Sequence, residues 1–155
     1  MKTLIIFLIT SLSFSVNAQN DKIDFIEFEY SCPHIVFSGV EISIYQTLNI
    51  DEYEIKAKYY NRTKQVEKQL YIKSAEFNKL IKQFRKIKNV DIINSYESGL
   101  DGATTSVKVS SSFNNSIEYS IWGLHKSQTK SKSKELLKMI QLILNISNVK
   151  IDDFN

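Results

Sequence analysis

Hydrophobic and polar residues alternate along the first half of the chain. Ile26, Phe28 and Tyr30, for example, alternate with Glu27 and Glu29. A period of two places the apolar side chains on one face of a β-strand and the charged side chains on the other, which faces water. Short polar clusters separate the segments that have this period. The pattern therefore predicts an antiparallel meander of four strands: residues 26–30, 40–44, 53–59 and 66–72.

The period changes at about residue 74, where a helix is predicted. Ser74 is the expected N-cap, Glu76 lies in the first turn, and Asn89 is the expected left-handed stop. Between them apolar residues recur at helical spacing: Phe77, Leu80, Ile81, Phe84 and Ile87.

Residues 103–113 and 116–122 are predicted as a further pair of strands. A two-residue turn between them would set Val109 opposite Ser120 and mix the apolar and polar faces. A three-residue loop would instead set Val109 opposite Ile121 and keep the apolar residues together. The hydrophobic pattern therefore favours an odd loop or a bulge.

A second helix is predicted from Ser133 to about residues 145–148. Its apolar face consists of six residues: Leu136, Leu137, Met139, Ile140, Ile143 and Leu144. The predicted element order is thus ββββ-α-ββ-α. This order indicates an α+β fold, with an antiparallel sheet of about six strands and two helices covering one of its faces.

Residues 1–18 have the features of a cleavable secretory signal peptide. Lys2 precedes the uncharged apolar run 4–9, and Ala18 stands directly before the expected cleavage point at Gln19. The mature chain is then a single α+β domain of residues 19–155. No later segment is apolar enough to anchor in a membrane, so no transmembrane segment is expected in the mature chain. We therefore expect a periplasmic or secreted protein.

Few residues suggest metal or catalytic chemistry. The two histidines, His34 and His125, lie far apart in the sequence, whereas a zinc site needs three or four converging ligands. Glycine-rich phosphate loops and nucleophile elbows are absent from the sequence. We therefore assign no catalytic residue, metal ligand or cofactor. The single cysteine, Cys32, cannot form an intramolecular disulfide; a buried or incidental thiol is expected, and intermolecular pairing or a nucleophile are the alternatives.

Charge is segregated along the chain. From Asp21 to Glu54 there are eight acidic residues and one lysine, whereas from Lys56 to Lys88 there are eleven basic residues and two glutamates. The predicted helix carries four of these basic residues away from its apolar face: Lys79, Lys82, Arg85 and Lys86. A basic patch can bind an acidic protein, anionic headgroups or nucleic acid, and export disfavours nucleic acid. The alternative is that acidic strands neighbour basic strands and the helix face is only solvated.

Trp122 and Lys108 are a second pair of candidate binding residues. In the favoured register they share the polar face of the hairpin. An exposed indole beside a lysine can anchor a partner and form a cation–π contact. A helix that covers this face would bury the indole instead.

Asp101 lies in the run Gly-Leu-Asp-Gly-Ala-Thr-Thr at residues 99–105. We expect an Asx-turn that starts the hairpin, and a small polar pocket shared with Trp122 is the functional alternative. Together with the basic helix and the Tyr-Ser-Ile-Trp run, this segment resembles small uncharacterised secreted or periplasmic proteins of Gram-negative bacteria. The resemblance covers residues 74–146. Those proteins have no agreed activity, so it implies no function.

These features predict an exported binding protein rather than an enzyme. Another protein is the expected partner, and an envelope glycan or an anionic lipid is the second class. A small hydrolase with a non-local active site is the alternative from a different class. A broad face around Trp122 or the basic helix would favour a binding protein, whereas a deep pocket with perturbed carboxylates or histidine would favour an enzyme.

Overall fold

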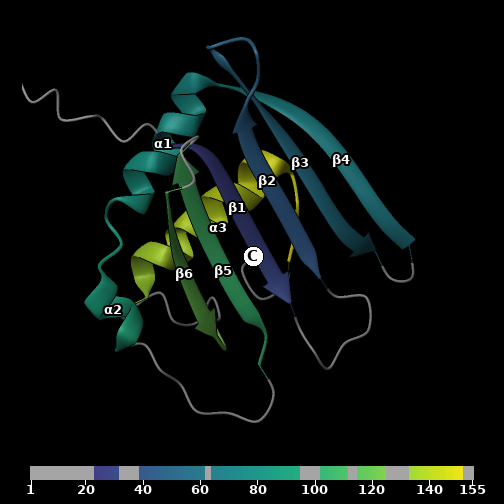
Figure 1. Cartoon of the computed structure of the whole chain (residues 1–155). Helices are drawn as coiled ribbons and strands as arrows, with labels where there is room; N and C mark the ends of the chain where they lie inside the picture. The colour runs from purple at the N-terminus through teal and green to yellow at the C-terminus, as the bar shows by residue number, and fades with distance from the viewer. Residues whose placement is uncertain are drawn as a thin grey trace, which may run out of the picture.

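A computed structural model describes six ranges of the chain: residues 23–31, 39–61, 64–94, 102–111, 115–124 and 133–151. Their centre is a six-stranded antiparallel sheet of order β4-β3-β2-β1-β5-β6 (Figure 1). The strands are β1 (Ile23–Ser31), β2 (Val40–Gln46), β3 (Glu52–Asn61), β4 (Lys64–Lys73), β5 (Thr104–Ser111) and β6 (Ser116–Trp122). The helices of these ranges are α1 (Ser74–Phe84), α2 (Asn89–Ile93) and α3 (Lys134–Ser147).

Strand β1 lies inside the sheet because it pairs with both β2 and β5. On one side, β1 to β4 form the predicted meander, in which each strand pairs with the next. On the other side, the β5–β6 hairpin extends the sheet from β1. The predicted α+β class, with an antiparallel sheet of six strands, is confirmed.

The β5–β6 register differs from the predicted one. Val109 pairs with Ile117 rather than with Ile121. The backbone N–H of Ser111 donates to the carbonyl oxygen of Asn115 at 2.9 Å, which leaves three residues between them. The connection therefore has the predicted length but lies two positions earlier. Each β5 residue consequently pairs four positions earlier on β6, and an even shift leaves every side chain on its predicted face.

The N-cap of helix α1 lies one residue earlier than expected. Lys73, not Ser74, is the N-cap residue, and its backbone N–H donates to the carboxylate of Glu76 at 3.3 Å. Ser74 is the first helical residue, and its hydroxyl donates to the carbonyl oxygen of Ile50 at 3.4 Å. The predicted acidic residue in the first turn therefore stabilises the helix start.

The end of the first helix was predicted wrongly. Helix α1 ends at Phe84, and Asn89 begins the short helix α2 instead of adopting the left-handed conformation. Among the described non-glycine residues, only Asn148 has a positive φ, of 52°, directly after α3. Asn148 thus gives the second long helix the left-handed stop that was expected for the first.

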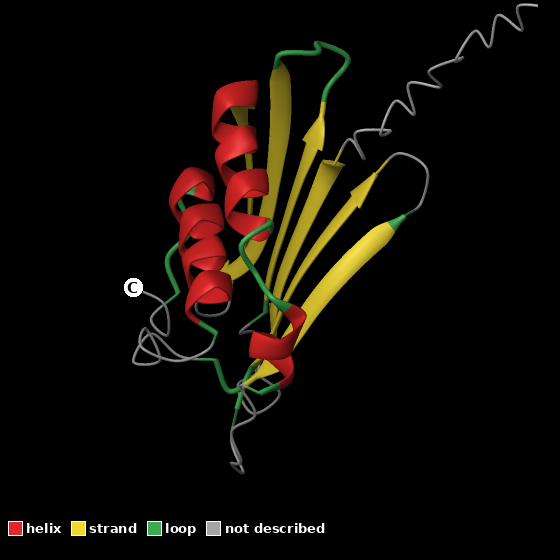
Figure 2. Cartoon of the chain, turned by 90° about the vertical axis from the view of Figure 1, so that its left-hand side faces the viewer, coloured by secondary structure: helices red, strands yellow, loops and turns green. Residues whose placement is uncertain are grey.

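The two longer helices lie on the same face of the sheet (Figure 2). The apolar residues predicted for both helices are buried there, together with the apolar faces of the strands. The rings of Phe77 in α1 and Tyr53 in β3 stack with their centroids 3.8 Å apart. Phe84 contacts Tyr119 of β6, with centroids 5.2 Å apart. Helix α1 is therefore packed against strands from both halves of the sheet.

Several predictions concern residues outside the described ranges: the signal peptide 1–18, Cys32, both histidines and Asp101. Of the helices that the structure describes, none is both long enough and apolar enough to cross a membrane.

Candidate functional site

Four basic side chains form one exposed surface at α1, which we call the basic surface: Lys79, Lys82, Arg85 and Lys86. Lys79 and Lys82 lie on α1, whereas Arg85 and Lys86 lie in the turn that follows it. Within the described ranges, none of the four has an ion pair closer than 4 Å. Lys86 lies near enough to Glu135 to contribute to the lowered pKa of that carboxyl, whereas Lys79, Lys82 and Arg85 are exposed on the surface.

Gln83 connects α1, which carries part of the basic surface, to α3. Its side chain is buried, and its amide nitrogen donates to both the backbone oxygen and the carboxylate of Glu135 at 2.9 Å. The bond from Gln83, and then the bond from Lys138, lowers the pKa of Glu135 below its ordinary value. A carboxyl with a lowered pKa stabilises the fold above its unfolded pKa and loses this contribution as the pH falls through its folded pKa. The hydrogen bond from Gln83 to the Glu135 carboxylate therefore weakens in acid, whereas the bond to the backbone oxygen does not titrate.

The structure divides the predicted binding residues between two sides of the sheet. Helix α1, which carries part of the basic surface, lies on the helical side (Figures 1 and 2). Lys108 and Trp122 lie on the opposite side, which the described helices leave uncovered; we call it the open face. A single rigid partner patch cannot contact both groups at once.

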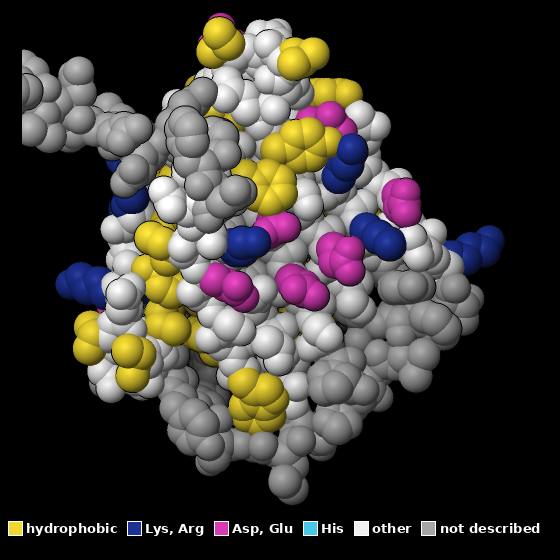
Figure 3. All heavy atoms as spheres, in the orientation of Figure 1, with side chains coloured by type: hydrophobic (Ala, Val, Ile, Leu, Met, Phe, Trp, Pro, Cys, Tyr) yellow, Lys and Arg dark blue, Asp and Glu magenta, His cyan; other side chains and the backbone are white. Residues whose placement is uncertain are grey.

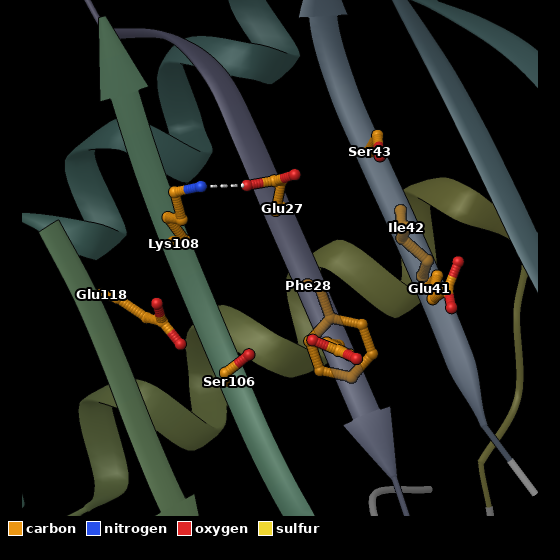
Figure 4. Close-up of a pocket in the computed structure, with 9 residues that line it drawn as sticks. Glu27, Phe28, Glu41, Ile42, Ser43, Ser106, Lys108 and Glu118 are labelled. Atoms are coloured by element: carbon orange, nitrogen blue, oxygen red, sulfur yellow. Dashed lines mark ion pairs between the residues drawn. The ribbon is translucent and has the colours of Figure 1, made fainter. Parts of the chain in front are cut away.

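Lys108 is paired on the open face. Its Nζ lies 2.8 Å from the carboxylate of Glu27 on β1, as Figure 4 shows. The hydrogen bond to Glu27 raises the pKa of Lys108 above its ordinary value. Glu118 on β6 lies opposite Lys108 and adds to this shift. Lys108 is thus part of a cross-strand charge network rather than a free cation.

Acidic side chains gather near the middle of the open face (Figure 3). Glu29 of β1 lies directly opposite Glu41 of β2, and within the described ranges neither carboxylate has an ion pair closer than 4 Å. Together with Glu27, Lys108 and Glu118 they line a hollow of about 340 Å³. Like charges directly opposite each other on neighbouring strands destabilise a sheet.

Replacing Glu29 by glutamine should therefore stabilise the fold. We expect Glu29→Gln to raise the free energy of unfolding by about 0.2–1 kcal/mol at low salt, with a smaller gain when salt screens the repulsion. Urea unfolding at two salt concentrations measures this. Glu27→Gln is the matched control and should give no gain, because Glu27 is paired with Lys108. A loss of stability in Glu29→Gln would show that this carboxylate has a favourable partner.

An aromatic row on the open face was not predicted as a site. Phe25, Tyr45, Glu54 and Tyr71 succeed one another across four strands. The rings of Phe25 and Tyr45 lie 6.2 Å apart, and Lys56 Nζ lies 5.3 Å from the Tyr45 ring centre. In each strand the residue lies at a position where the alternating pattern predicts a side chain on the face away from the core. Only the pairing of the strands brings them together.

Trp122 is half-buried at the C-terminal end of β6. Gly102 lies against its indole: a Cβ added to Gly102 would come within 2.9 Å of Nε1. The segment before β5 thus packs on Trp122, although the described helices leave the open face uncovered. Asp101, the proposed partner in a polar pocket, lies outside the described residues.

The segregated charges meet in space on the open face. Glu27 pairs with Lys108 of β5 and Glu52 with Lys73 of β4, whereas Glu54 pairs with Lys56 of its own strand, β3. Neutralisation between neighbouring strands, the alternative considered from the sequence, therefore accounts for part of the pattern. It does not account for the basic surface on α1.

No deep pocket or metal centre stands out in the described part of the chain. The hollow on the open face is shallow, and no group of three His, Cys, Asp or Glu side chains within the described ranges is placed to hold a metal ion. The resemblance of residues 74–146 to secreted Gram-negative proteins stays a prediction. Comparison with known proteins gives no match to a family model, to a curated protein or to a solved structure.

Proposed function

We propose that this chain is an exported binding protein that recognises an acidic partner protein through the basic surface. The observation that carries the proposal is the exposure of Lys79, Lys82, Arg85 and Lys86 without an ion pair to any described residue. On the same chain, three basic residues of the sheet are paired with glutamates: Lys56, Lys73 and Lys108. Cations that remain unpaired on a well-packed helix favour association with an anionic surface.

A protein is the preferred partner because the four cations are exposed along α1 and the turn that follows it, and only Arg85 lines a groove. Small-molecule sites are usually concave, whereas protein interfaces use exposed, complementary surfaces. Export, which the first eighteen residues favour, makes nucleic acid a poor candidate. An anionic lipid or glycan of the cell envelope has the same charge and is the second class of partner.

Charge reversal on α1 tests the proposal. Lys82→Glu with Lys86→Glu changes the charge of the basic surface by four units and should weaken partner binding about tenfold or more, most strongly at low salt. The matched control is Lys64→Glu with Lys150→Glu, because both lysines are exposed and lie away from α1. Affinity capture from the extracytoplasmic fraction of the producing organism, quantified by mass spectrometry, compares both variants with the unchanged protein.

The expected result is one or a few acidic proteins that are captured by the unchanged protein and the control variant and lost by the α1 variant. Equal capture by all three proteins would contradict a role for the basic surface. Loss of binding to vesicles that contain anionic lipid, with no protein affected, would assign the surface to the envelope instead.

A further inference from the structure

Strand β6 leaves a free edge. Among the described strands it pairs only with β5, and it is the outermost of them on that side of the sheet (Figure 1). The backbone hydrogen bonds from Ser111 to Asn115 and from Gly123 to Ala103 show that odd-numbered β6 residues direct their N–H and C=O groups toward β5. In an antiparallel pair the alternate residues then direct theirs outward. The outward groups belong to Ser116, Glu118 and Ser120.

A groove with an apolar floor adjoins this edge on the helical side of the sheet. It has a volume of about 390 Å³, and Ile23, Val109, Ile117 and Arg85 line it together with serine and asparagine residues. Ile117, in the β6 position that faces the core, is 54% exposed. The described chain therefore covers Ile117 only in part, although this side chain faces the core.

Helix α2 lies beside β6, because the hydroxyl of Tyr119 donates to the side-chain oxygen of Asn89 at 2.8 Å. On α2, Val90 is 57% exposed and Ile93 is 76% exposed. Exposed apolar side chains that gather in this way mark interaction sites in soluble proteins.

The other edge strand of the sheet, β4, is protected. Lys68 of β4 occupies a core-facing position opposite Ala57, where its Nζ donates to the carbonyl oxygen of Asn148 at 2.9 Å and lies 5.3 Å from the Tyr59 ring centre. A lysine that points inward on an edge strand hinders the addition of another strand. The core-facing positions of β6 are Ile117, Tyr119 and Ile121, so β6 has no such charge.

We propose that β6 binds an extended segment of the acidic partner as a seventh strand. The outward N–H and C=O groups of β6 require an extended backbone as their complement. Apolar side chains of the segment would cover Ile117 and fill the groove. An Asp or Glu on the same side of the segment would meet Arg85, which has no ion pair with a described residue. The inference rests on the proposed function, because Arg85 belongs to the basic surface.

Random peptides of about twelve residues, displayed on phage and selected on the full chain, provide the probe. The enriched peptides should alternate apolar and polar residues, with an Asp or Glu among the apolar positions. A synthetic copy of the best peptide should bind with chemical-shift changes centred on the β6 amides. Its affinity should fall about tenfold or more when N-methyl groups block alternate backbone N–H groups of the peptide.

Three variants locate the binding. Ile117→Lys places a charge in the groove and Arg85→Glu reverses the charge at its rim; each should weaken peptide binding about tenfold. Ser120→Pro removes an outward N–H, which an edge strand tolerates, and should have a similar effect. Thermal melting of each variant confirms that it is folded, and Lys68→Glu on β4 should leave binding unchanged.

Enrichment of no alternating peptide, or peptide binding that is insensitive to Ile117→Lys and Ser120→Pro, would overturn strand addition. A dimer of the chain that Ile117→Lys dissociates would also overturn it, because a second copy would then occupy the edge. Binding lost only in Lys82→Glu with Lys86→Glu would reject strand addition while the proposed function stands. Binding lost only in the β6 variants, with all acidic partners retained by the α1 variant, would reject the basic surface instead.

Discussion

Replacing Phe84 by alanine is expected to lower the free energy of unfolding by about 3–5 kcal/mol. Phe84 is only 4% exposed, and its ring contacts Tyr119 across the interface between α1 and β6. Removing the ring takes away buried apolar area and leaves a cavity that the surrounding side chains can fill only in part. Urea unfolding followed by circular dichroism measures the loss.

Lys82→Glu with Lys86→Glu serves as the control, with one change on α1 and one in the turn that follows it. Exposed charges contribute only about 0–1 kcal/mol each, so this variant should remain nearly as stable as the unchanged protein. A large loss of stability in the control would mean that the lysines are needed by the fold itself. A loss below about 1 kcal/mol in Phe84→Ala would mean that α1 is not held by this contact.

Gly102→Ala is expected to destabilise the fold by about 1–3 kcal/mol. The added methyl group would lie within 2.9 Å of the Trp122 Nε1, so the indole or the segment before β5 must shift. Trp122 is the only tryptophan, and its fluorescence therefore reports the shift directly. We expect emission at longer wavelength as the indole gains contact with water.

The control for Gly102→Ala is Gly39→Ala, directly before β2. A Cβ added to Gly39 would make only an ordinary contact with the carbonyl oxygen of Tyr30, at 3.8 Å. Stability and tryptophan emission should therefore stay nearly unchanged. Unchanged emission and stability in Gly102→Ala would show that the indole does not pack on Gly102.

The sheet and its buried face could be predicted because alternation is a local signal. Ile26 and Phe28 are buried, and Glu27 and Glu29 point to the other face, whichever strands lie beside them. The β5–β6 register could not be predicted in the same way. Pairing Val109 with Ile117 or with Ile121 gives the same two faces, so the hydrophobic pattern does not distinguish the two registers.

The short helix α2 was missed because five residues are too few to show a helical period. Val90 and Ile93 are exposed although they are apolar, and since no residue of α2 is buried, the helix shows no amphipathic pattern. In the fold the same residues lie on α2, beside the free edge of β6. The sequence shows that they are apolar, but only the fold shows that they remain uncovered.

The exposure of the basic side chains on α1 could be predicted from the sequence. Helical spacing separates Lys79 and Lys82 from Phe77 and Leu80, and the structure exposes the first pair and buries the second. The acidic pair of the open face could not be found in this way. Glu29 and Glu41 lie twelve positions apart, and only the β1–β2 register sets them opposite each other.

Site-specific photo-crosslinking in the producing organism tests the central claim most directly. A photoreactive benzophenone amino acid replaces Lys82 of the basic surface in one variant and Ser43 of the open face in another. We predict that position 82 gives an adduct of defined mass with an acidic protein, that Lys79→Glu with Lys86→Glu abolishes it, and that position 43 gives none. An adduct from position 43, with none from position 82, would contradict recognition through the basic surface.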